Sequence, residues 1–276
     1  MSDLAAKADR LLQLLTGLDR CLVAYSGGVD SMLVAAAAQK AIGNRATAVM
    51  AVSPSLAEGE REAAVAAAQQ IGIRFQSIET DELSRGGYVR NAADRCYYCK
   101  STLYDQLAVL AQQQQAVVVN GANLDDLGDY RPGMRAAVER MVRSPLVECD
   151  FRKSDVRALA QLWRLPAWDK PATPCLASRI AYGEEVTADR LRMIDQAERF
   201  LRNLGCRSVR VRYHRGDMAR IEVAAEDLAT LTEPTTRTAI TAAFRSYGFQ
   251  FISLDLDGFR SGSLNALVAI GSSPTD

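Results

Sequence analysis

Short apolar stretches alternate with longer stretches of helical periodicity through the first part of the chain. The short stretches, rich in Val and Ala, predict buried strands, whereas apolar residues three or four positions apart predict helices. Strands that alternate with helices are typical of an α/β domain whose parallel sheet is covered on both faces. The predicted strands are residues 21–24, 46–52, 74–78 and 116–120, and the predicted helices are residues 4–15, 32–41, 56–71, 100–112 and 154–163.

The pattern changes near residue 178. A long amphipathic stretch predicts a helix, and two runs of alternating apolar and polar residues around a His-Arg-Gly-Asp turn predict a hairpin. We therefore expect a parallel-sheet domain at residues 1–178 and a smaller α+β domain at residues 179–276. The elements predicted in the second domain are helices 187–204 and 234–247 and strands 208–213, 220–223 and 251–256.

Composition narrows the class of protein. The 276 residues are 48% apolar and carry no net charge, whereas a protein that wraps long nucleic acid usually has a basic excess. No apolar run approaches the roughly 20 residues that span a bilayer, and residues 1–13 lack the apolar core of a secretory signal. We therefore expect a cytoplasmic protein with no membrane or nucleic-acid partner. Its six cysteines are then thiols or ligands rather than disulfides.

The most informative motif lies between the first strand and the helix that follows it. The first N–H groups of a helix lack internal partners and lie at the positive end of its dipole. Glycines let the backbone approach a bound anion, so the motif is predicted to cradle phosphate. It is not a Walker A loop, because the Gly-Lys-Ser/Thr ending is absent. The loop consists of Ser26, Gly27, Gly28, Val29, Asp30 and Ser31.

A polar stretch after the fourth strand, residues 120–133, is the second candidate part of a nucleotide site. Ligands of a parallel sheet lie beyond the carboxyl ends of its strands. The acidic residues of this stretch and Asp30 are candidate ligands of Mg²⁺, which binds a few carboxylates plus phosphate oxygens. A solvated loop is the alternative. The other expected ATP contacts, here and at the end of the second strand, are Gly121, Asp125, Arg131, Ala51 and Ser53.

Cysteine spacing bears on the reaction. Cys96 and Cys99 form a Cys-x-x-Cys, which is a zinc half-site, a redox pair, an iron–sulfur half-site or a coincidence. Structural zinc needs four Cys or His ligands. The chain has one histidine, His214, which lies in the predicted hairpin of the second domain, so a zinc site is hard to complete. With Cys175, three cysteines suffice for a [4Fe-4S] cluster that leaves one iron open. We expect the other three cysteines to be buried and structural: Cys21, Cys149 and Cys206.

Charged residues of the second half are candidates for binding or for activating a thiol. Arg210 and Arg212 lie on one face of a predicted strand, where paired guanidinium groups suit a phosphate. A solvent-facing strand is the alternative. The weaker candidates are Glu198 and Glu222 as helpers of these arginines, and Lys170 and Arg179, which flank Cys175, as cations that favour its thiolate.

The loop at residues 26–31 resembles the pyrophosphate-binding loop of the PP-loop ATPases, the adenine nucleotide alpha hydrolases. Members of that superfamily cleave ATP between the α and β phosphates and attach AMP to a substrate oxygen. Together with this loop, residues 120–133 and the string PCLASRI at 174–180 resemble LarE. LarE is the pyridinium-3,5-biscarboxylic acid mononucleotide sulfurtransferase family of nickel-pincer cofactor synthesis. The resemblance covers nearly the whole chain.

This resemblance implies an enzyme that uses ATP and Mg²⁺ to adenylate a carboxylate of a small pyridinium mononucleotide. A sulfur nucleophile then displaces AMP and leaves a thiocarboxylate. Some members give up the sulfur of their own cysteine at the position of Cys175; others, similar to this chain in having Cys96 and Cys99, hold a [4Fe-4S] cluster on three cysteines and pass on a bound sulfide. The resemblance also implies homo-oligomers and a role for the arginines of the second domain in binding the substrate phosphate.

Two other classes stay open. A PP-loop tRNA thiolation enzyme also uses cysteines, but the neutral charge and the lack of a recognisable RNA-binding module disfavour it. A non-enzymatic module that binds adenine nucleotides is the third class, and the placement of the three cysteines disfavours it.

Overall fold

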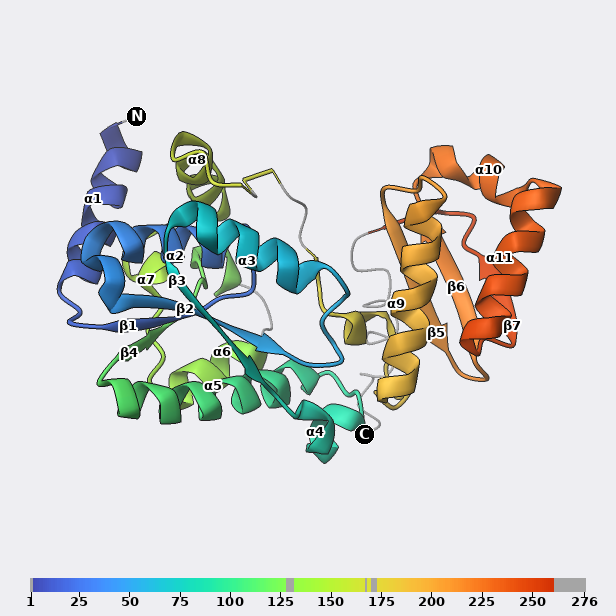
Figure 1. Cartoon of the computed structure of the whole chain (residues 1–276), viewed down its shortest axis with the longest axis horizontal. Coiled ribbons are helices and arrows are strands. Elements are labelled where there is room, and N and C mark those ends of the chain that lie inside the picture. Colours follow the sequence, from blue (N-terminus) through green and yellow to red (C-terminus); the bar gives the residue numbers. More distant parts are fainter. Residues whose placement is uncertain (1, 128–131, 167, 170–172, 261–276) are drawn as a thin grey trace, which may run out of the picture. The chain divides into compact units, whose positions relative to one another are not determined.

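The computed structural model describes residues 2–127, 132–166, 168–169 and 173–260. The chain divides into two compact units (Figure 1). The first unit comprises Met1–Glu82 and Cys96–Thr173, and the second comprises Leu83–Arg95 and Pro174–Asp276. Each unit has its own β-sheet.

Four strands form the sheet of the first unit: β1 (Cys21–Ala24), β2 (Ala46–Val52), β3 (Arg74–Glu79) and β4 (Val117–Val119). Their order is β3-β2-β1-β4, and every pair is parallel, which confirms the predicted α/β fold. The chain moves outward from β1 to β3 and then returns to place β4 on the other side of β1. In parallel sheets, this reversal of order opens a ligand crevice at the carboxyl ends of the strands.

Helices cover both faces of this sheet: α1 (Ser2–Thr16), α2 (Val29–Ile42), α3 (Glu60–Ile71), α5 (Arg95–Gln114), α6 (Pro132–Glu139), α7 (Pro145–Glu148) and α8 (Lys153–Leu162). In Figure 1, α1, α2, α3 and α8 lie on one face, and α5 and α6 lie on the other. Val23 and Ala48 pack on the side of α2, while Leu22 and Val49 pack on the side of α5. The strands are therefore apolar at successive positions, as a sheet covered on both faces requires.

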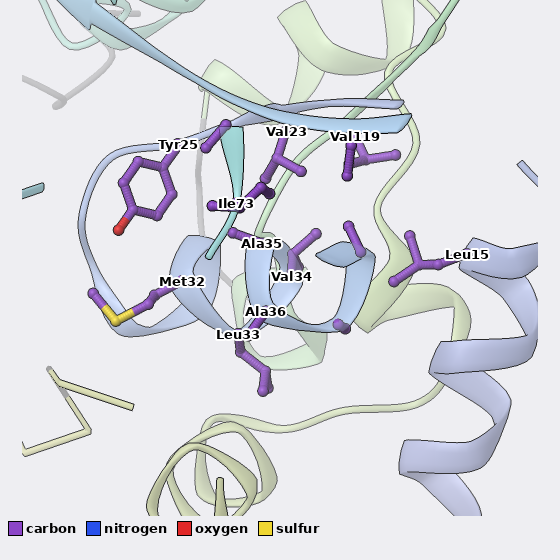
Figure 2. Packing of buried hydrophobic residues seen from close by; sticks show 14 of the residues in the cluster. Leu15, Val23, Tyr25, Met32, Leu33, Val34, Ala35, Ala36, Ile73 and Val119 are labelled. Atoms are coloured by element: carbon purple, nitrogen blue, oxygen red, sulfur yellow. The ribbon is translucent and has the colours of Figure 1, made fainter. Parts of the chain in front are cut away.

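The helix α2 is buried along most of its length. It carries four consecutive alanines at residues 35–38, none more than 3% exposed, so its backbone lies close to its neighbours. Figure 2 shows this helix packed between the sheet residues Val23 and Val119 and Leu15 of α1. A helix with no solvated face is expected to be apolar all round. This packing fixes the start of α2 directly beyond the carboxyl end of β1.

Several helix limits differ from those expected from the sequence. α2 begins at Val29 and α5 at Arg95, earlier than expected, whereas α3 begins later, at Glu60. The early start of α5 places Cys96 and Cys99 inside the first turns of a helix rather than in a preceding loop. The short helices α6 and α7 were not predicted, because short helices carry too few residues to show a period. Among the residues that the structure describes, no helix has the length and apolar character to cross a membrane.

The second unit contains β5 (Val209–His214), β6 (Met218–Val223) and β7 (Phe251–Leu254), with the helices α4 (Gly86–Val89), α9 (Ala188–Asn203), α10 (Leu228–Thr232) and α11 (Pro234–Tyr247). β5 and β6 form the predicted antiparallel hairpin, and β7 is parallel to β6. Helices α9 and α11 pack beside each other, with α9 against β5. This mixed sheet with its helices confirms the expected α+β character.

The segment Leu83–Arg95 groups with the second unit, although it lies within the predicted first domain at residues 1–178, whose limits stay a prediction. The fully buried side chain of Asn91 donates hydrogen bonds to the carbonyls of Ala181 (2.8 Å) and Glu184 (2.9 Å). Arg95 donates to the carbonyl of Ala177 at 2.8 Å. These bonds join residues about 90 positions apart, which explains why the sequence did not reveal them.

Candidate active site

The loop at residues 26–31 lies between β1 and α2 and is shaped mainly by its backbone. Gly27 has a φ of +74°, in the left-handed region that favours glycine. A Cβ on Gly27 would also lie 3.2 Å from the Cβ of Ala64 in α3. Gly28 is the N-cap residue of α2 and makes no side-chain cap, so the helix end is open to an outside acceptor. This geometry is suited to binding an anion, and phosphate binding by the loop stays a prediction.

Two serine hydroxyls hold this loop together. Ser31 Oγ accepts a hydrogen bond from the Ser26 backbone N–H at 3.1 Å and donates to the Gly28 carbonyl at 3.0 Å. The hydroxyls of Ser26 and Ser31 also lie 3.1 Å apart. These bonds tie the loop to its own main chain and limit the conformations that it can adopt.

Gly121 allows the chain after β4 to touch the start of α2. A Cβ at this position would lie 2.6 Å from the Ser31 nitrogen and 2.8 Å from the carbonyl carbon of Asp30. Both are backbone atoms, so no side-chain movement can relieve the clash. Gly121 was predicted as an ATP contact, and the structure shows a packing reason for glycine at the same place.

A cavity of about 480 Å³ lies beside the loop in the first unit. Ser26, Asp30, Ser31 and Gly121 line it, together with Cys96. The described lining residues do not include six other expected contacts, which are Gly27, Gly28, Val29, Ala51, Ser53 and Asp125. Arg131, the last expected contact, lies outside the described residues. The volume lies within the range typical of small-molecule sites.

The two carboxylates that were expected to meet ATP or Mg²⁺ have protein partners. Asp30 Oδ2 lies 2.5 Å from Lys153 Nζ, and its Oδ1 accepts from the Asn123 side chain at 3.1 Å. Asp125 accepts from the Lys153 backbone N–H at 2.8 Å and pairs with Arg152 at 3.1 Å. Asp30 also lines the cavity, whereas Asp125 holds the first residue of α8.

The two residues expected at the adenine have different surroundings. Ser53 donates a hydrogen bond to Glu82 at 2.5 Å, and Glu82 is only 3% exposed. Ala51 packs with the cluster on the α5 face of the sheet. Contact of either residue with adenine stays a prediction.

The six cysteines fall into two groups. Cys21, Cys149 and Cys206 are buried, as expected for structural residues. Burial raises the pKa of the Cys21 thiol to about 12, and it also raises the pKa values of Cys149 and Cys206, so none of the three is a ready nucleophile. The three candidates for sulfur chemistry are the accessible ones: Cys96 and Cys175 are exposed, and Cys99 is half-buried.

Within each unit, the described residues contain no group of three His, Cys, Asp or Glu side chains placed to hold a metal ion. Cys96 and Cys99 belong to the first unit and Cys175 to the second. The one histidine is already engaged, because His214 Nε2 accepts a hydrogen bond from Arg220 at 3.1 Å. Burial and the nearby cations lower the pKa of His214. Zinc ligation by His214 would have to break this contact, which supports the expectation that a zinc site is hard to complete.

The loop that carries Cys175 is held by a buried ion pair. Arg179 and Glu198 are both 0% exposed, and the Arg179 Nε donates to Glu198 at 3.0 Å. The same guanidinium donates to the backbone carbonyls of Pro174 and Cys175. Arg179 therefore positions the loop through its main chain, which differs from the expected role as a cation that favours the thiolate. The other flanking cation, Lys170, lies outside the described residues.

Arg210 and Arg212 share one face of β5, as the alternation predicted, but their surroundings differ. Arg212 is 6% exposed, pairs with Glu222 at 2.8 Å and donates to the Ser178 carbonyl at 3.2 Å. Arg210 has no carboxylate partner among the described residues and stacks on the ring of Phe259. Burial and the neighbouring arginines lower the pKa of Arg210 to about 10. Of the two, Arg210 is the one that forms no ion pair with a carboxylate of the described residues, although the charge of Glu198 lies near it.

Sequence reasoning missed two lysines of the first unit. Lys100 lines the cavity, and Lys153 reaches the phosphate loop through Asp30. Each looked like an ordinary charge near the start of a helix. One weak indication for Lys153 was present in the sequence: it follows a strand and loop of the parallel sheet, and ligands bind beyond the carboxyl ends of such strands.

Comparison with known proteins agrees with this geometry. The NAD synthase family model matches residues 14–93, which include the loop, β1, β2 and α2. An uncharacterized protein of Synechocystis sp. is 46% identical over 96% of this chain and 99% of its own length. A protein of Lactiplantibacillus plantarum called pyridinium-3,5-bisthiocarboxylic acid mononucleotide synthase is 39% identical over 96% of both chains. An uncharacterized protein of Methanocaldococcus jannaschii is 28% identical over 88% of this chain and 91% of its own.

The parallel sheet, the Ser-Gly-Gly-Val-Asp-Ser loop and the NAD synthase match define a protein of the PP-loop class. The similarity to the Lactiplantibacillus protein extends through both units, well beyond that shared domain. The chain belongs to the LarE family.

Proposed function

We propose that the protein transfers sulfur to the carboxylates of pyridinium-3,5-biscarboxylic acid mononucleotide in an ATP-dependent reaction. The observation that carries the proposal is the strand-to-helix loop at residues 26–31, which is held by its own serine hydroxyls. It occurs in a chain that is 39% identical over 96% of its length to a synthase of the corresponding bisthiocarboxylic acid. The product of that relative differs from the proposed substrate by sulfur in place of carboxylate oxygen.

The first step is activation of the carboxylate. A carboxylate is a poor acyl donor, because its leaving group would be oxide. A carboxylate oxygen attacks the α-phosphorus of ATP, pyrophosphate leaves, and AMP becomes the leaving group of the acyl adenylate. The open N–H groups at the start of α2 would bind phosphate, and Asp30 is the described loop residue that can hold Mg²⁺.

The second step is attack of sulfur on the acyl carbon, with departure of AMP. Cys175 is exposed, and its loop is fixed by Arg179 and Glu198, so its sulfur can be presented in a defined position. A thiolate is the nucleophilic form of cysteine. If Cys175 gives its own sulfur, its Cβ–S bond breaks, the Cα proton is lost, and dehydroalanine and the thiocarboxylate remain.

A [4Fe-4S] cluster on Cys96, Cys99 and Cys175 is the alternative source of sulfur. The three thiols are candidate ligands, because they are accessible whereas the other cysteines of the chain are buried. Thiolates are the usual ligands of such clusters. When bound, the cluster would supply the sulfide for transfer, and the protein would survive many turnovers.

Arg210 supports binding of the substrate phosphate. Its guanidinium lacks a carboxylate partner among the described residues, whereas Arg212 is matched by Glu222. A phosphate would provide Arg210 with a direct ion-pair partner. Arg212 would then act mainly by binding the Ser178 carbonyl. It would thereby hold the loop that carries Cys175, which we call the cysteine loop.

The proposal is tested with anaerobic, iron- and sulfide-reconstituted protein supplied with ATP, Mg²⁺ and the pyridinium dicarboxylate. We expect AMP, pyrophosphate and a thiocarboxylate product, each detected by mass spectrometry or phosphorus NMR. Absence of both AMP and thiocarboxylate would contradict the proposal. Light scattering in the same buffer checks the expected homo-oligomer.

Variants of the cysteines distinguish the two candidate sources of sulfur. With a cluster, the reconstituted protein shows the broad visible absorbance of thiolate-ligated iron, and Cys96→Ser or Cys99→Ser abolishes both absorbance and multiple turnover. With a sacrificial cysteine, the protein loses the mass of one H₂S at Cys175, and both variants stay active without iron. Cys206→Ser is the matched control, since Cys206 is buried.

A further inference from the structure

An ion pair links the phosphate loop to a distant part of the first unit. Lys153, the first residue of α8, places its Nζ 2.5 Å from Oδ2 of Asp30. The side chains remain 37% and 26% exposed, so both are accessible to a ligand. Asp30 lines the 480 Å³ cavity. Lys153 is not among the described residues that line the cavity, but it contacts the lining residue Asp30.

The position of Lys153 is set by a second carboxylate. Asp125 Oδ2 accepts from the Lys153 backbone N–H at 2.8 Å, and its Oδ1 pairs with Arg152. Asn123 donates to the other oxygen of Asp30 at 3.1 Å. The loop after β4 thus holds both members of the ion pair: Asn123 fixes Asp30, and Asp125 fixes the main chain of Lys153.

The negative charge of a bound triphosphate indicates a role for Lys153. A triphosphate carries several negative charges, and the loop lacks the lysine that a Walker A loop provides. Lys100 is the one cation among the described residues that line the cavity. Mg²⁺ binds carboxylate oxygens, and a magnesium ion on Asp30 would compete with the Lys153 ammonium for the same carboxylate. The displaced ammonium, on a flexible stem, would then lie beside phosphate oxygens.

We propose that Lys153 binds the pyrophosphate portion of ATP, exchanging its contact with Asp30 for one with the β- and γ-phosphates when Mg²⁺ reaches Asp30. This inference rests on the proposed function, because it requires that the loop binds ATP. Lys153 then helps the pyrophosphate leave by balancing its charge, and the return to Asp30 after release resets the site. A purely structural ion pair would instead tie α8 to the loop equally in every ligand state.

The test is ligand binding by the whole protein. Lys153→Met removes the charge and keeps the length of the side chain. The probes are α,β-methylene-ATP with Mg²⁺, which cannot be cleaved at the reacting bond, and AMP, which lacks the pyrophosphate portion. We expect the affinity for α,β-methylene-ATP to fall about 10- to 100-fold, as for loss of a charge-assisted hydrogen bond, while the affinity for AMP changes less than about twofold. Lys153→Arg keeps the charge and restores part of the loss.

Lys40→Met is the matched control. It makes the same charge change in the same unit, but Lys40 lies in the last turn of α2, where it stacks on Trp163. It should leave both affinities unchanged. A second measurement needs no variant: acetylation of Lys153 in the wild-type protein, followed by mass spectrometry, should be slowed by α,β-methylene-ATP and by pyrophosphate but not by AMP.

Two results would overturn the proposal. Equal losses of affinity for α,β-methylene-ATP and AMP would show a structural pair, and no loss for either would show that Lys153 does not meet the nucleotide. Failure of the proposed function has a different signature. Wild-type protein that binds α,β-methylene-ATP through Lys153 yet forms no AMP from the pyridinium dicarboxylate would refute the proposed reaction and leave the role of Lys153 intact.

Discussion

The two loops to which we assign chemistry are built in opposite ways. The phosphate loop of the first unit is shaped by glycines and by short serine hydroxyls that bond to the main chain. The cysteine loop of the second unit is shaped by long side chains, Arg179 and Arg212, which reach its carbonyls from fully or almost fully buried ion pairs.

This difference predicts which kind of substitution disrupts each loop. A loop made of backbone fails when a side chain is added, because the main chains can no longer approach each other. A loop held by buried charges fails when one partner is removed, because the other is left without a counter-charge in a poorly solvated place. Substitutions of the two kinds should therefore separate the two loops.

The largest effect is expected for Arg179→Met. Arg179 and Glu198 are both 0% exposed, so the variant leaves a buried carboxylate whose remaining partners are the half-exposed Arg202 and the backbone N–H of Val211. Loss of one member of a buried pair costs about 3–5 kcal/mol of unfolding free energy. Urea unfolding of the whole protein measures it. The control is Arg192→Met, which breaks an exposed pair with Asp189 and should cost less than about 1 kcal/mol.

The next effect concerns the phosphate loop. Gly121→Ala places a Cβ 2.6 Å from the Ser31 nitrogen, so the chain after β4 must move away from α2. We expect a loss of about 2–3 kcal/mol in stability, as for overpacking, and weaker binding of α,β-methylene-ATP. Gly86→Ala is the control, because a Cβ there meets nothing within 4 Å. Wild-type nucleotide affinity in Gly121→Ala would show that this close approach does not shape the site.

Substitution of Arg210 should weaken substrate binding while changing the stability of the second unit little. Arg210→Gln removes a guanidinium that has no carboxylate partner among the described residues, so unfolding should change little. The KM for the mononucleotide should rise about 30-fold, which corresponds to about 2 kcal/mol for a charge-assisted contact. The same change should have no effect on a substrate that lacks the phosphate. An equal penalty for both substrates would contradict phosphate binding by Arg210.

The smallest effect is on alkaline stability. Burial raises the pKa of Cys21 to about 12, so the unfolded chain loses this proton at lower pH than the folded protein does. The contribution of Cys21 to stability is therefore complete below its unfolded pKa near 9 and is lost as pH rises toward 12. Cys21→Ala should reduce the drop in unfolding free energy between about pH 8 and 10 by about 1 kcal/mol. An unchanged slope would contradict this assignment.

The two loops also differ in how much of them could be predicted from sequence. The phosphate loop was predictable because its geometry demands glycine, and glycine at a strand-to-helix junction is visible in the sequence. The parallel sheet was predictable for the same kind of reason, since its strands are apolar at successive positions. The alternation of Arg210 and Arg212 correctly placed both on one strand face, but not the pairing of Arg212 with Glu222.

What could not be predicted depends on contacts between residues far apart in the chain. Asp30 and Lys153 are 123 positions apart, and nothing in the local pattern of either connects them. The segment that contains Asn91 groups with the second unit through hydrogen bonds to residues about 90 positions later in the chain. Arg179 was assigned to the thiol of Cys175 from proximity in sequence, whereas its guanidinium meets Glu198 and the main chain.

The central claim is that the phosphate loop serves to join AMP to a carboxylate that sulfur then attacks. The most direct test uses a pyridinium dicarboxylate labelled with ¹⁸O in its carboxylates, with ATP, Mg²⁺ and anaerobic, reconstituted protein. An acyl adenylate leaves one carboxylate oxygen on AMP, so the account predicts AMP that carries ¹⁸O, in step with thiocarboxylate formation. Thiocarboxylate formed with unlabelled AMP, or with the label in inorganic phosphate, would contradict it.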